Sequence, residues 1–218
     1  MLIFPRSCNL HELKIIHTLV TLSQSQSKSH PQMNIYIFNG VAIVWILSEI
    51  YLNRFLRSAK QDKHADKNTE LFLWITIGLA TFAGVFLSRA WALPVFADED
   101  LAYVGIAMMV LGILIRFSAI KQLGKYFTVD VAVRQDHQLM QMGFYKYLRH
   151  PSYAGSLISF LGFGIALNNW ISVAAVFIPV LIAFILRMNV EEKVLTEQFG
   201  KPYTDYMSQT KRVLPFVY

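Results

Sequence analysis

The 218-residue sequence has little cysteine and little charge. Cys8 is its only cysteine, so an intrachain disulfide is excluded and a zinc site built on cysteines is not expected. Charged residues make up 16% of the chain and hydrophobic residues 55%, whereas a soluble domain usually carries about 25% charge. The composition therefore argues against a soluble protein, and its high apolar content argues against a disordered one.

A net charge of +6 is typical of nucleic-acid-binding proteins only where the basic residues share one surface. Here the charges form a few clusters between long apolar runs, which is typical of membrane proteins. The sequence also has no Gly-rich phosphate loop and no histidine spacing that suggests a metal site. We therefore expect membrane lipids around the protein, no nucleic-acid partner, no metal and no obligate protein partner.

Five apolar stretches predict transmembrane helices, each of which needs roughly 20 mostly apolar residues. They cover residues 35–52, 71–93, 101–120, 152–167 and 170–188. The last two belong to one charge-free run that is too long for a single span, and Asn168 and Asn169 in its middle favour a turn. The predicted fold class is an all-α integral membrane protein with about five transmembrane helices, of which the last two form a tight helical hairpin.

The same pattern predicts three regions along the chain. Residues 1–32 form an N-terminal extension that ends in a polar Ser/Gln linker, and Met33, just before the first span, is a candidate for the biological start. Residues 33–120 hold the first three spans. Residues 121–218 hold the hairpin and two polar clusters that flank it, and we expect the functional core there.

The distribution of Lys and Arg predicts the orientation in the membrane. Basic residues occur in the stretches 53–70, 121–150 and 189–218, whereas the loop 94–100 contains none and the turn 168–169 is uncharged. Basic and non-basic connections thus alternate at every crossing. By the positive-inside rule, the N-terminus is outside, and the C-terminus and both polar clusters are cytoplasmic. We therefore expect a pocket on the cytoplasmic side.

The first polar cluster leads into the hairpin. It contains His137-Gln138-Leu139-Met140, then Tyr145, then Arg149-His150-Pro151-Ser152-Tyr153. Proline suits the first turn of a helix, and a helix N-terminus presents unpaired N–H groups and partial positive charge. This N-terminus, with Arg149 and His150 beside it, is a candidate site for a carboxylate or phosphate. A belt of basic and tyrosine residues at the membrane interface explains the same residues equally well.

The second cluster follows the last span. Arg187 and Glu191 lie four residues apart, so they share one face of a helix. A snorkelling arginine with a helical salt bridge is the structural interpretation; the depth of Arg187 in the membrane favours a functional one. Glu49, Arg89 and Arg116 lie near span ends, where snorkelling explains them, although Arg116 is placed to face the pocket.

Small residues recur at helical spacing in the fourth predicted span. Gly155, Ser159, Gly162 and Ala166 follow one another at intervals of three or four residues. Small residues at such intervals let two membrane helices approach closely. We therefore predict that this stripe serves helix packing rather than ligand binding.

Taken together, the two clusters resemble the isoprenylcysteine carboxyl methyltransferase family. The resemblance rests on Arg149-His150-Pro151-Ser152-Tyr153, Gly155, Arg187-x-x-x-Glu191-Glu192, Phe199-Gly200, Tyr203 and Leu214-Pro215, with a helical hairpin between the two groups. It extends over residues 124–216. The resemblance implies an integral membrane enzyme that uses S-adenosylmethionine to methylate the carboxylate of a lipid-linked or isoprenoid substrate.

The resemblance also implies roles for individual residues. Arg187 would face the substrate carboxylate and is the predicted catalytic residue. The cofactor would be bound by His137, Gln138, Leu139, Met140, Tyr145, His150, Pro151, Ser152, Tyr153 and Glu191. A carboxylate is already ionised at neutral pH, so methylation of this acceptor needs no general base.

Three alternatives remain open on the sequence. A related membrane methyltransferase acting on a phospholipid amine would need a base, and His137 or Glu192 is a candidate. An NADPH-dependent sterol-type reductase resembles the region around Pro151, but that pattern has Asn and Glu where Ser152 and Ser156 stand here. A membrane scaffold or transport component leaves the polar clusters unexplained.

Overall fold

The computed structural model describes residues 35–55, 63–66, 68–98, 102–127, 131–133 and 139–213. The chain divides into two units, Met1–Gln32 and Met33–Tyr218, and every described residue lies in the second. The N-terminal extension expected at residues 1–32 therefore lies outside the described residues. His137, Gln138, Leu214 and Pro215 lie outside them as well.

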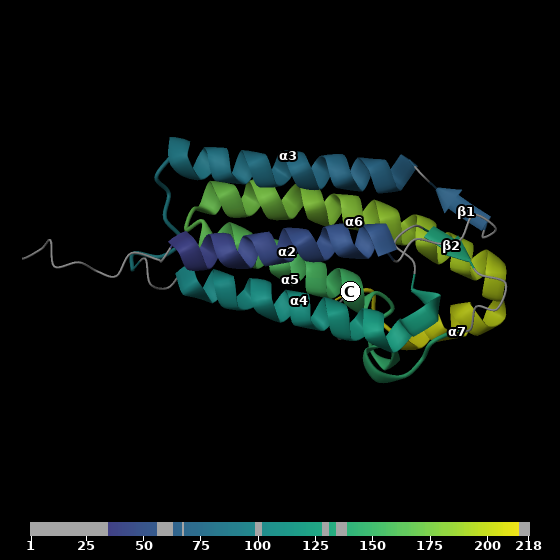
Figure 1. Ribbon diagram of the computed structural model, residues 1–218. Helices are drawn as coiled ribbons and strands as arrows, with labels where there is room; N and C mark the ends of the chain where they lie inside the picture. The colour runs from purple at the N-terminus through teal and green to yellow at the C-terminus, as the bar shows by residue number, and fades with distance from the viewer. Residues whose placement is uncertain are drawn as a thin grey trace, which may run out of the picture. The chain divides into compact units, whose positions relative to one another are not determined.

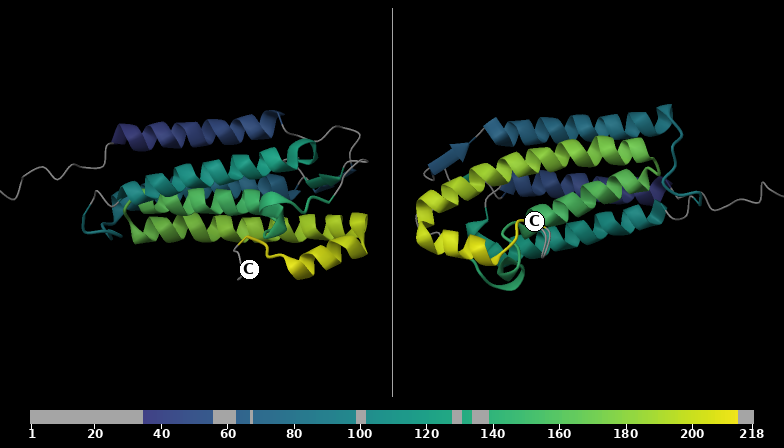
Figure 2. Two further views of the ribbon diagram at one scale, coloured as in Figure 1. Left: turned by 90° about the horizontal axis from the view of Figure 1, so that it is seen from below. Right: turned by 180° about the vertical axis from the view of Figure 1, so that it is seen from behind.

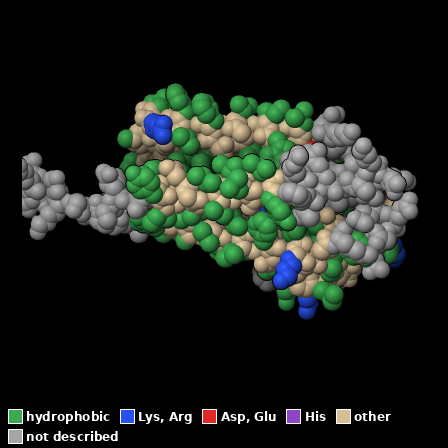
Figure 3. Space-filling view, in the orientation of Figure 1, with side chains coloured by type: hydrophobic (Ala, Val, Ile, Leu, Met, Phe, Trp, Pro, Cys, Tyr) green, Lys and Arg blue, Asp and Glu red, His purple; other side chains and the backbone are tan. Residues whose placement is uncertain are grey.

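Five apolar helices run alongside one another (Figure 1). They are α2 (Ile35–Phe55), α3 (Asn68–Ala90), α4 (Tyr103–Leu123), α5 (Pro151–Ala166) and α6 (Trp170–Phe199). Four of them are long and apolar enough to cross a membrane, and α5 is a shorter apolar helix. Hydrophobic side chains cover most of their length on the face seen in Figure 3. These findings confirm the predicted integral membrane protein built of helices.

Helix α5 is the most buried element, because it packs against both α4 and α6. The α4–α5 contact is close: a Cβ added to Gly155 would lie 2.7 Å from the backbone nitrogen of Arg116 and from the backbone oxygen of Gly112. A Cβ on Gly162 would similarly lie 2.6 Å from the oxygen of Gly105. The stripe of small residues therefore serves helix packing, as its spacing predicts.

The predicted helical hairpin is present, and two asparagines form its turn. Asn168 adopts a φ of 46°, a left-handed conformation that asparagine tolerates better than most residues. Asn169 caps α6, because its side chain accepts a hydrogen bond from the backbone N–H of Ser172 at 3.1 Å. The Asn168 side chain also exchanges hydrogen bonds with the backbone of Phe96, so the hairpin turn contacts the loop after α3.

Helix α6 is longer than the sequence predicts. We expected the last span to end at residue 188, but the helix continues to Phe199 and stops at Gly200, whose φ is 60°. No glycine or proline interrupts the polar stretch after residue 188, so the helix continues until a residue suited to a left-handed cap. Glu191 and Glu192 consequently lie on the same continuous helix as Arg187.

Short elements gather at the end of the helices where α6 projects furthest (Figure 1). Two strands that the sequence did not predict, β1 (Lys63–Asp66) and β2 (Val131–Val133), pair antiparallel there. The 3-10 helices η2 (Gly124–Tyr126) and η3 (Gly143–Lys146) precede α5, and α7 (Lys201–Gln209) follows α6. Figure 2 shows α7 folded back beside the end of α6. The described parts of the connections predicted to be basic thus meet at one end of the helices.

Candidate active site

A cavity of about 320 Å³ opens among the helices at this end. Its volume is at the lower limit of the range for small-molecule sites, about 300–1,000 Å³. One part of the wall is polar and comes from the first turns of α5 and from α6. Another part, here called the apolar arm, consists of Trp45, Leu73, Ile77, Phe160 and Phe184. The cavity therefore offers a polar and an apolar compartment that are continuous.

Three side chains form a hydrogen-bonded chain in the polar part. The guanidinium Nε of Arg187 donates to the Tyr153 hydroxyl at 3.2 Å, and that hydroxyl donates to Oε2 of Glu191 at 2.8 Å. Arg187 is only 2% exposed. The predicted pair of Arg187 and Glu191 is thus joined through Tyr153, which belongs to the other helix of the hairpin.

The start of α5 is built as the sequence predicts. Pro151 occupies the first turn, where its missing N–H costs nothing. His150 precedes it as the N-cap but makes no side-chain capping bond; instead its ring stacks on Tyr153, with centroids 5.4 Å apart. The backbone N–H groups of Ser152 and Tyr153, in the first turn, have no acceptor within the helix itself. They therefore contribute positive potential beside the cavity.

Glu192 engages Arg149, one of the two residues that the sequence places beside the candidate anion site. Nε of Arg149 donates to Oε1 of Glu192 at 2.8 Å, and its Nη1 donates to the backbone oxygens of Met207 and Thr210. The second Glu192 oxygen accepts from Nη2 of Arg212 at 2.6 Å. Glu192 thereby ties the segment before α5 to the segment after α7.

Backbone hydrogen bonds reinforce this attachment. The N–H of Arg149 donates to the oxygen of Lys211 at 2.7 Å, and that of His150 donates to the oxygen of Arg212 at 3.0 Å. His150 Nε2 also lies 3.2 Å from Oε1 of Glu192. The residues after α7 therefore hold His150, and with it the N-terminus of α5, against α6.

Tyrosines from η3 and α7 also line the cavity. The Tyr206 hydroxyl donates to the backbone oxygen of Tyr145 at 2.6 Å. The Tyr203 hydroxyl is different: it is fully buried and has no hydrogen-bond partner among the described residues. Burial raises the pKa of Tyr206 to about 12, and burial together with the negative charge of Glu191 raises the pKa of Tyr203 further above its usual range. Both phenols therefore remain neutral donors at pH 7.

The snorkelling interpretation was wrong for Glu49 and Arg116, although Arg116 lines the cavity as the sequence analysis suggested. Instead of snorkelling separately, they pair between α2 and α4: Nη2 of Arg116 donates to Oε2 of Glu49 at 2.8 Å, and Nε lies 2.8 Å from Oε1. Arg116 Nη1 also donates to the hydroxyls of Ser152 and Ser156 at 3.1 and 2.7 Å. Two opposite charges predicted at the same end of different spans were the signal for this pair.

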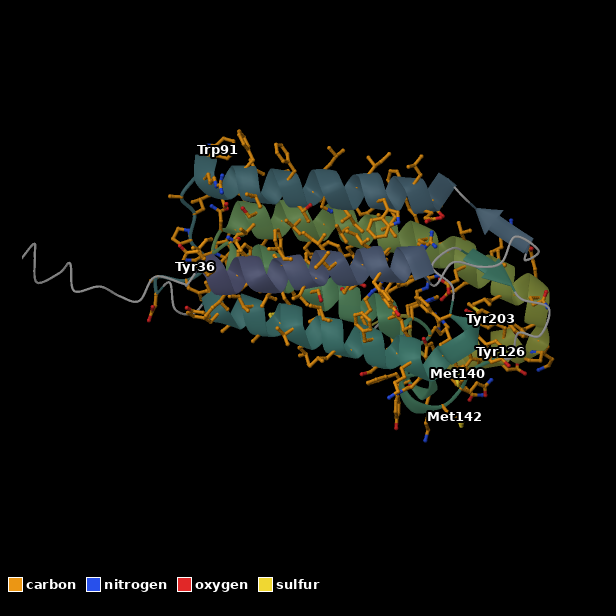
Figure 4. All side chains as sticks on the ribbon, in the orientation of Figure 1. Tyr36, Trp91, Tyr126, Met140, Met142 and Tyr203 are labelled. Atoms are coloured by element: carbon orange, nitrogen blue, oxygen red, sulfur yellow. The ribbon has the colours of Figure 1, made fainter. Side chains whose placement is uncertain are left out.

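Most of the predicted site residues meet at the cavity. Its lining includes Arg187 and seven of the predicted cofactor residues, which are Leu139, Met140, Tyr145, His150, Ser152, Tyr153 and Glu191. Pro151 is buried at the start of α5 but is not part of the lining. Met140 and Tyr203 lie at the same end of the helices in Figure 4, opposite Tyr36 and Trp91.

Comparisons with known proteins agree with this geometry. Residues 101–202 match the model of the phospholipid methyltransferase family. The chain is 36% identical over 115 residues to protein-S-isoprenylcysteine O-methyltransferase B of Arabidopsis thaliana, a match that covers 52% of this chain and 58% of that protein. It is 34% identical over 117 residues to the protein-S-isoprenylcysteine O-methyltransferase of Saccharomyces cerevisiae, covering 52% and 48% respectively.

A solved structure is also similar. The eukaryotic intramembrane Ras methyltransferase ICMT superposes with a TM-score of 0.60 at 25% identity, over 84% of this chain and 67% of that chain. The chain is therefore similar in sequence, over about half its length, and in structure to isoprenylcysteine carboxyl methyltransferases. This confirms the resemblance and the membrane fold predicted from the sequence. The matched segments span 48–62% of the length of these isoprenylcysteine methyltransferases.

Proposed function

We propose that the chain is an S-adenosylmethionine-dependent carboxyl O-methyltransferase whose acceptor is the carboxylate of a lipid-linked cysteine. The observation that carries the proposal is the position of Arg187. Its guanidinium is buried in a cavity wall between the polar first turn of α5 and the apolar arm. A cation at such a boundary suits a ligand that has an anionic head and an apolar tail.

The cavity residues fit the proposed cofactor. The buried Tyr203 hydroxyl without a partner among the described residues is a donor that a bound ligand would satisfy. Glu191, 30% exposed at its side chain, is an acceptor for an amine or for ribose hydroxyls. The N-terminus of α5 suits a carboxylate. Leu139, Met140, Tyr145, His150, Pro151, Ser152 and Tyr153 are the other described residues that we assign to the cofactor, and His137 and Gln138 complete the set.

When bound, S-adenosylmethionine supplies an electrophilic methyl group on a sulfonium. The chain's own residues then have to bind the cofactor and the acceptor, orient them, and exclude water from the site. Arg187 orients the acceptor carboxylate, and Tyr153 fixes the Arg187 guanidinium through its hydrogen bond to Nε. Because a carboxylate is ionised at neutral pH, no residue is required to remove a proton. The surrounding apolar helices keep water away from the reacting groups.

The apolar arm is the proposed site for the isoprenoid. It extends from Arg187 between α2, α3, α5 and α6, and aromatic rings make up much of its wall. Each buried methylene contributes roughly 0.8 kcal/mol, so an isoprenoid chain of several units would supply much of the binding energy. The substrate would approach from the bilayer and the cofactor from the cytosol, in agreement with the charge pattern.

Methylation of a phospholipid amine is the second candidate, because the matching family model is described by that activity. An amine acceptor must first lose a proton. Glu192, one of the two bases considered for this step, already accepts hydrogen bonds from Arg149 and Arg212. This engagement favours the carboxylate acceptor.

Ligand binding by purified protein in detergent tests the proposal. We expect S-adenosylhomocysteine, but not NADPH, to bind in calorimetric titrations. Glu191→Gln should lose this binding, whereas Glu197→Gln, an exposed carboxylate on the same helix, should retain it. Methyl transfer to S-farnesylcysteine should exceed transfer to phosphatidylethanolamine and should fall about 100-fold or more in Arg187→Gln, because the partner of a bound carboxylate is removed.

The opposite results are equally informative. Binding of NADPH in place of S-adenosylhomocysteine would make the protein a reductase and would refute the role of Arg187. Preferred methylation of phosphatidylethanolamine would retain the cofactor assignment but replace the acceptor. Folded protein that binds neither ligand would contradict the enzymatic proposal altogether.

A further inference from the structure

The ion pair of Glu49 and Arg116 lies in the cavity wall and joins three helices. Glu49 comes from α2, Arg116 from α4, and the hydroxyls of Ser152 and Ser156 that also bind Arg116 come from α5. Both charged side chains are largely buried, at 11% and 17% exposed. Desolvating two charges is costly, so a buried ion pair is weak evidence for stability alone. Ionisable groups at membrane depth more often serve a function.

Apart from this ion pair, α2 packs against α4 and α5 through a small number of apolar side chains. Its ring contacts are with α5, where Trp45 meets Phe160 at 4.7 Å and Phe38 meets Phe163 at 5.6 Å between centroids. It has no extensive contact with α3, which packs on α6 instead. Most of the remaining α2 side chains are exposed. The ion pair is therefore a polar attachment of α2 at its end nearest the active site.

The cavity reaches the lipid-facing surface between α2 and α3. Ile46 and Ile50 of α2 line the cavity, yet each remains 55% exposed. Trp74 and Ile77 of α3 line the facing wall. Side chains that belong both to the cavity and to the apolar exterior mark the rim of an opening. This opening faces the region where hydrocarbon would surround the helices.

We infer that Glu49 and Arg116 are positioning residues for the lipid substrate: their ion pair holds α2 as one wall of the opening between α2 and α3. The pair sets the width of this opening, and through Ser152 and Ser156 it keeps α2 aligned with the start of α5. The inference rests on the proposed function only for the chemical nature of the substrate. The position of α2 is a property of the fold and can be measured separately.

Spin-label distances and steady-state kinetics test this role together. In a Cys8→Ser background, labels at Leu47→Cys on α2 and Leu71→Cys on α3 report the distance across the opening; both sites are exposed. We expect Glu49→Gln to broaden this distance distribution and to raise the KM for S-farnesylcysteine about tenfold or more, since one charge remains unpaired. The affinity for S-adenosylhomocysteine should stay within about twofold, because the pair does not touch the proposed cofactor residues other than Ser152.

Two further variants separate positioning from direct contact. The charge exchange Glu49→Arg with Arg116→Glu keeps an ion pair between α2 and α4, and the two serine hydroxyls can donate to the new carboxylate. It should therefore restore the narrow distance distribution and return the KM close to its wild-type value. Asp205→Asn removes a carboxylate from the exposed pair with Lys201 and should change neither readout.

Three results would overturn the inference. The first is a Glu49→Gln protein whose distance distribution and KM both equal those of the wild type. The second is a parallel loss of S-adenosylhomocysteine affinity, which would assign the pair to the cofactor site. The third is a charge exchange that restores neither readout. If the wild type transfers no methyl group, the proposed function fails, while the spin-label distances still decide whether the pair holds α2.

Discussion

Two tyrosines that lie one helical turn apart on α7 differ in the hydrogen bonding of their hydroxyl groups. Tyr206 satisfies a backbone carbonyl of η3, whereas the buried Tyr203 hydroxyl has no partner among the described residues. We expect Tyr203→Phe to weaken S-adenosylhomocysteine binding by about 1 kcal/mol, roughly fivefold, since one hydrogen bond to the ligand is lost. The thermal stability of the Tyr203→Phe protein should be unchanged or higher, because the substitution removes a buried hydroxyl that has no hydrogen-bond partner among the described residues.

Tyr206→Phe is the matched control. It should lower the unfolding temperature, because the carbonyl of Tyr145 loses its donor, and should affect ligand affinity less than Tyr203→Phe does. Calorimetric titration and thermal unfolding in the same detergent measure both quantities. Equal ligand affinity in Tyr203→Phe and wild type would place the bound cofactor away from Tyr203.

The role of each charged residue was harder to predict than its presence in the site. The motif predicted that Arg187, Glu191 and Tyr153 share one cavity, since the hairpin brings α5 beside α6. It did not predict that Glu192 would bind Arg149 and Arg212 instead of facing the cavity. Such partners depend on segments whose path is set by tertiary packing, not by local periodicity.

At the scale of elements, the close approach of α4 and α5 is the most sensitive packing feature. We expect Gly155→Ala to destabilise the protein by about 1–3 kcal/mol, because the new methyl group would overlap backbone atoms of α4 that cannot move aside. Gly78→Ala is the control on α3, since a Cβ there meets no atom within 4 Å. That variant should match or exceed wild-type stability, as alanine favours helices over glycine by up to about 1 kcal/mol.

Thermal unfolding of purified protein compares the two alanine variants directly. A lower unfolding temperature in Gly155→Ala but not in Gly78→Ala would identify steric overlap as the cause. A similar loss of stability in both variants would show that steric overlap with α4 is not the cause.

Helices were predictable from the sequence where apolar runs have clear ends. The hairpin turn followed from Asn168 and Asn169, whose conformations suit a sharp reversal and a helix cap. The end of α6 did not, because hydropathy marks where the membrane ends and not where the backbone stops being helical. The pairing of β1 with β2 joins segments far apart in the sequence, and neither strand has the length or alternation that predicts a strand.

At the scale of the whole molecule, the loops divide between the two ends as the alternating charges require. The basic connections share the end with β1, β2 and α7, while the loop after α3 meets the hairpin turn at the other end, where the N–H of Trp170 donates to the oxygen of Leu93 at 2.9 Å. The fold therefore pairs the connections that the sequence assigns to the same side. Which side faces the cytosol remains a prediction from the positive-inside rule.

Single-cysteine labelling tests that orientation. In a Cys8→Ser background, Ala97→Cys in the loop after α3 and Lys201→Cys at the start of α7 place thiols at exposed positions. The end of α3 and helix α7 lie at opposite ends of the helices (Figure 1). A membrane-impermeant maleimide should label Ala97→Cys in intact cells and Lys201→Cys only after permeabilisation, since positively charged loops stay in the cytosol. The reverse pattern would place the cavity outside the cytosol. A cofactor supplied from the cytosol would then have no path to Glu191 and Tyr203, so this result would also contradict the proposed reaction.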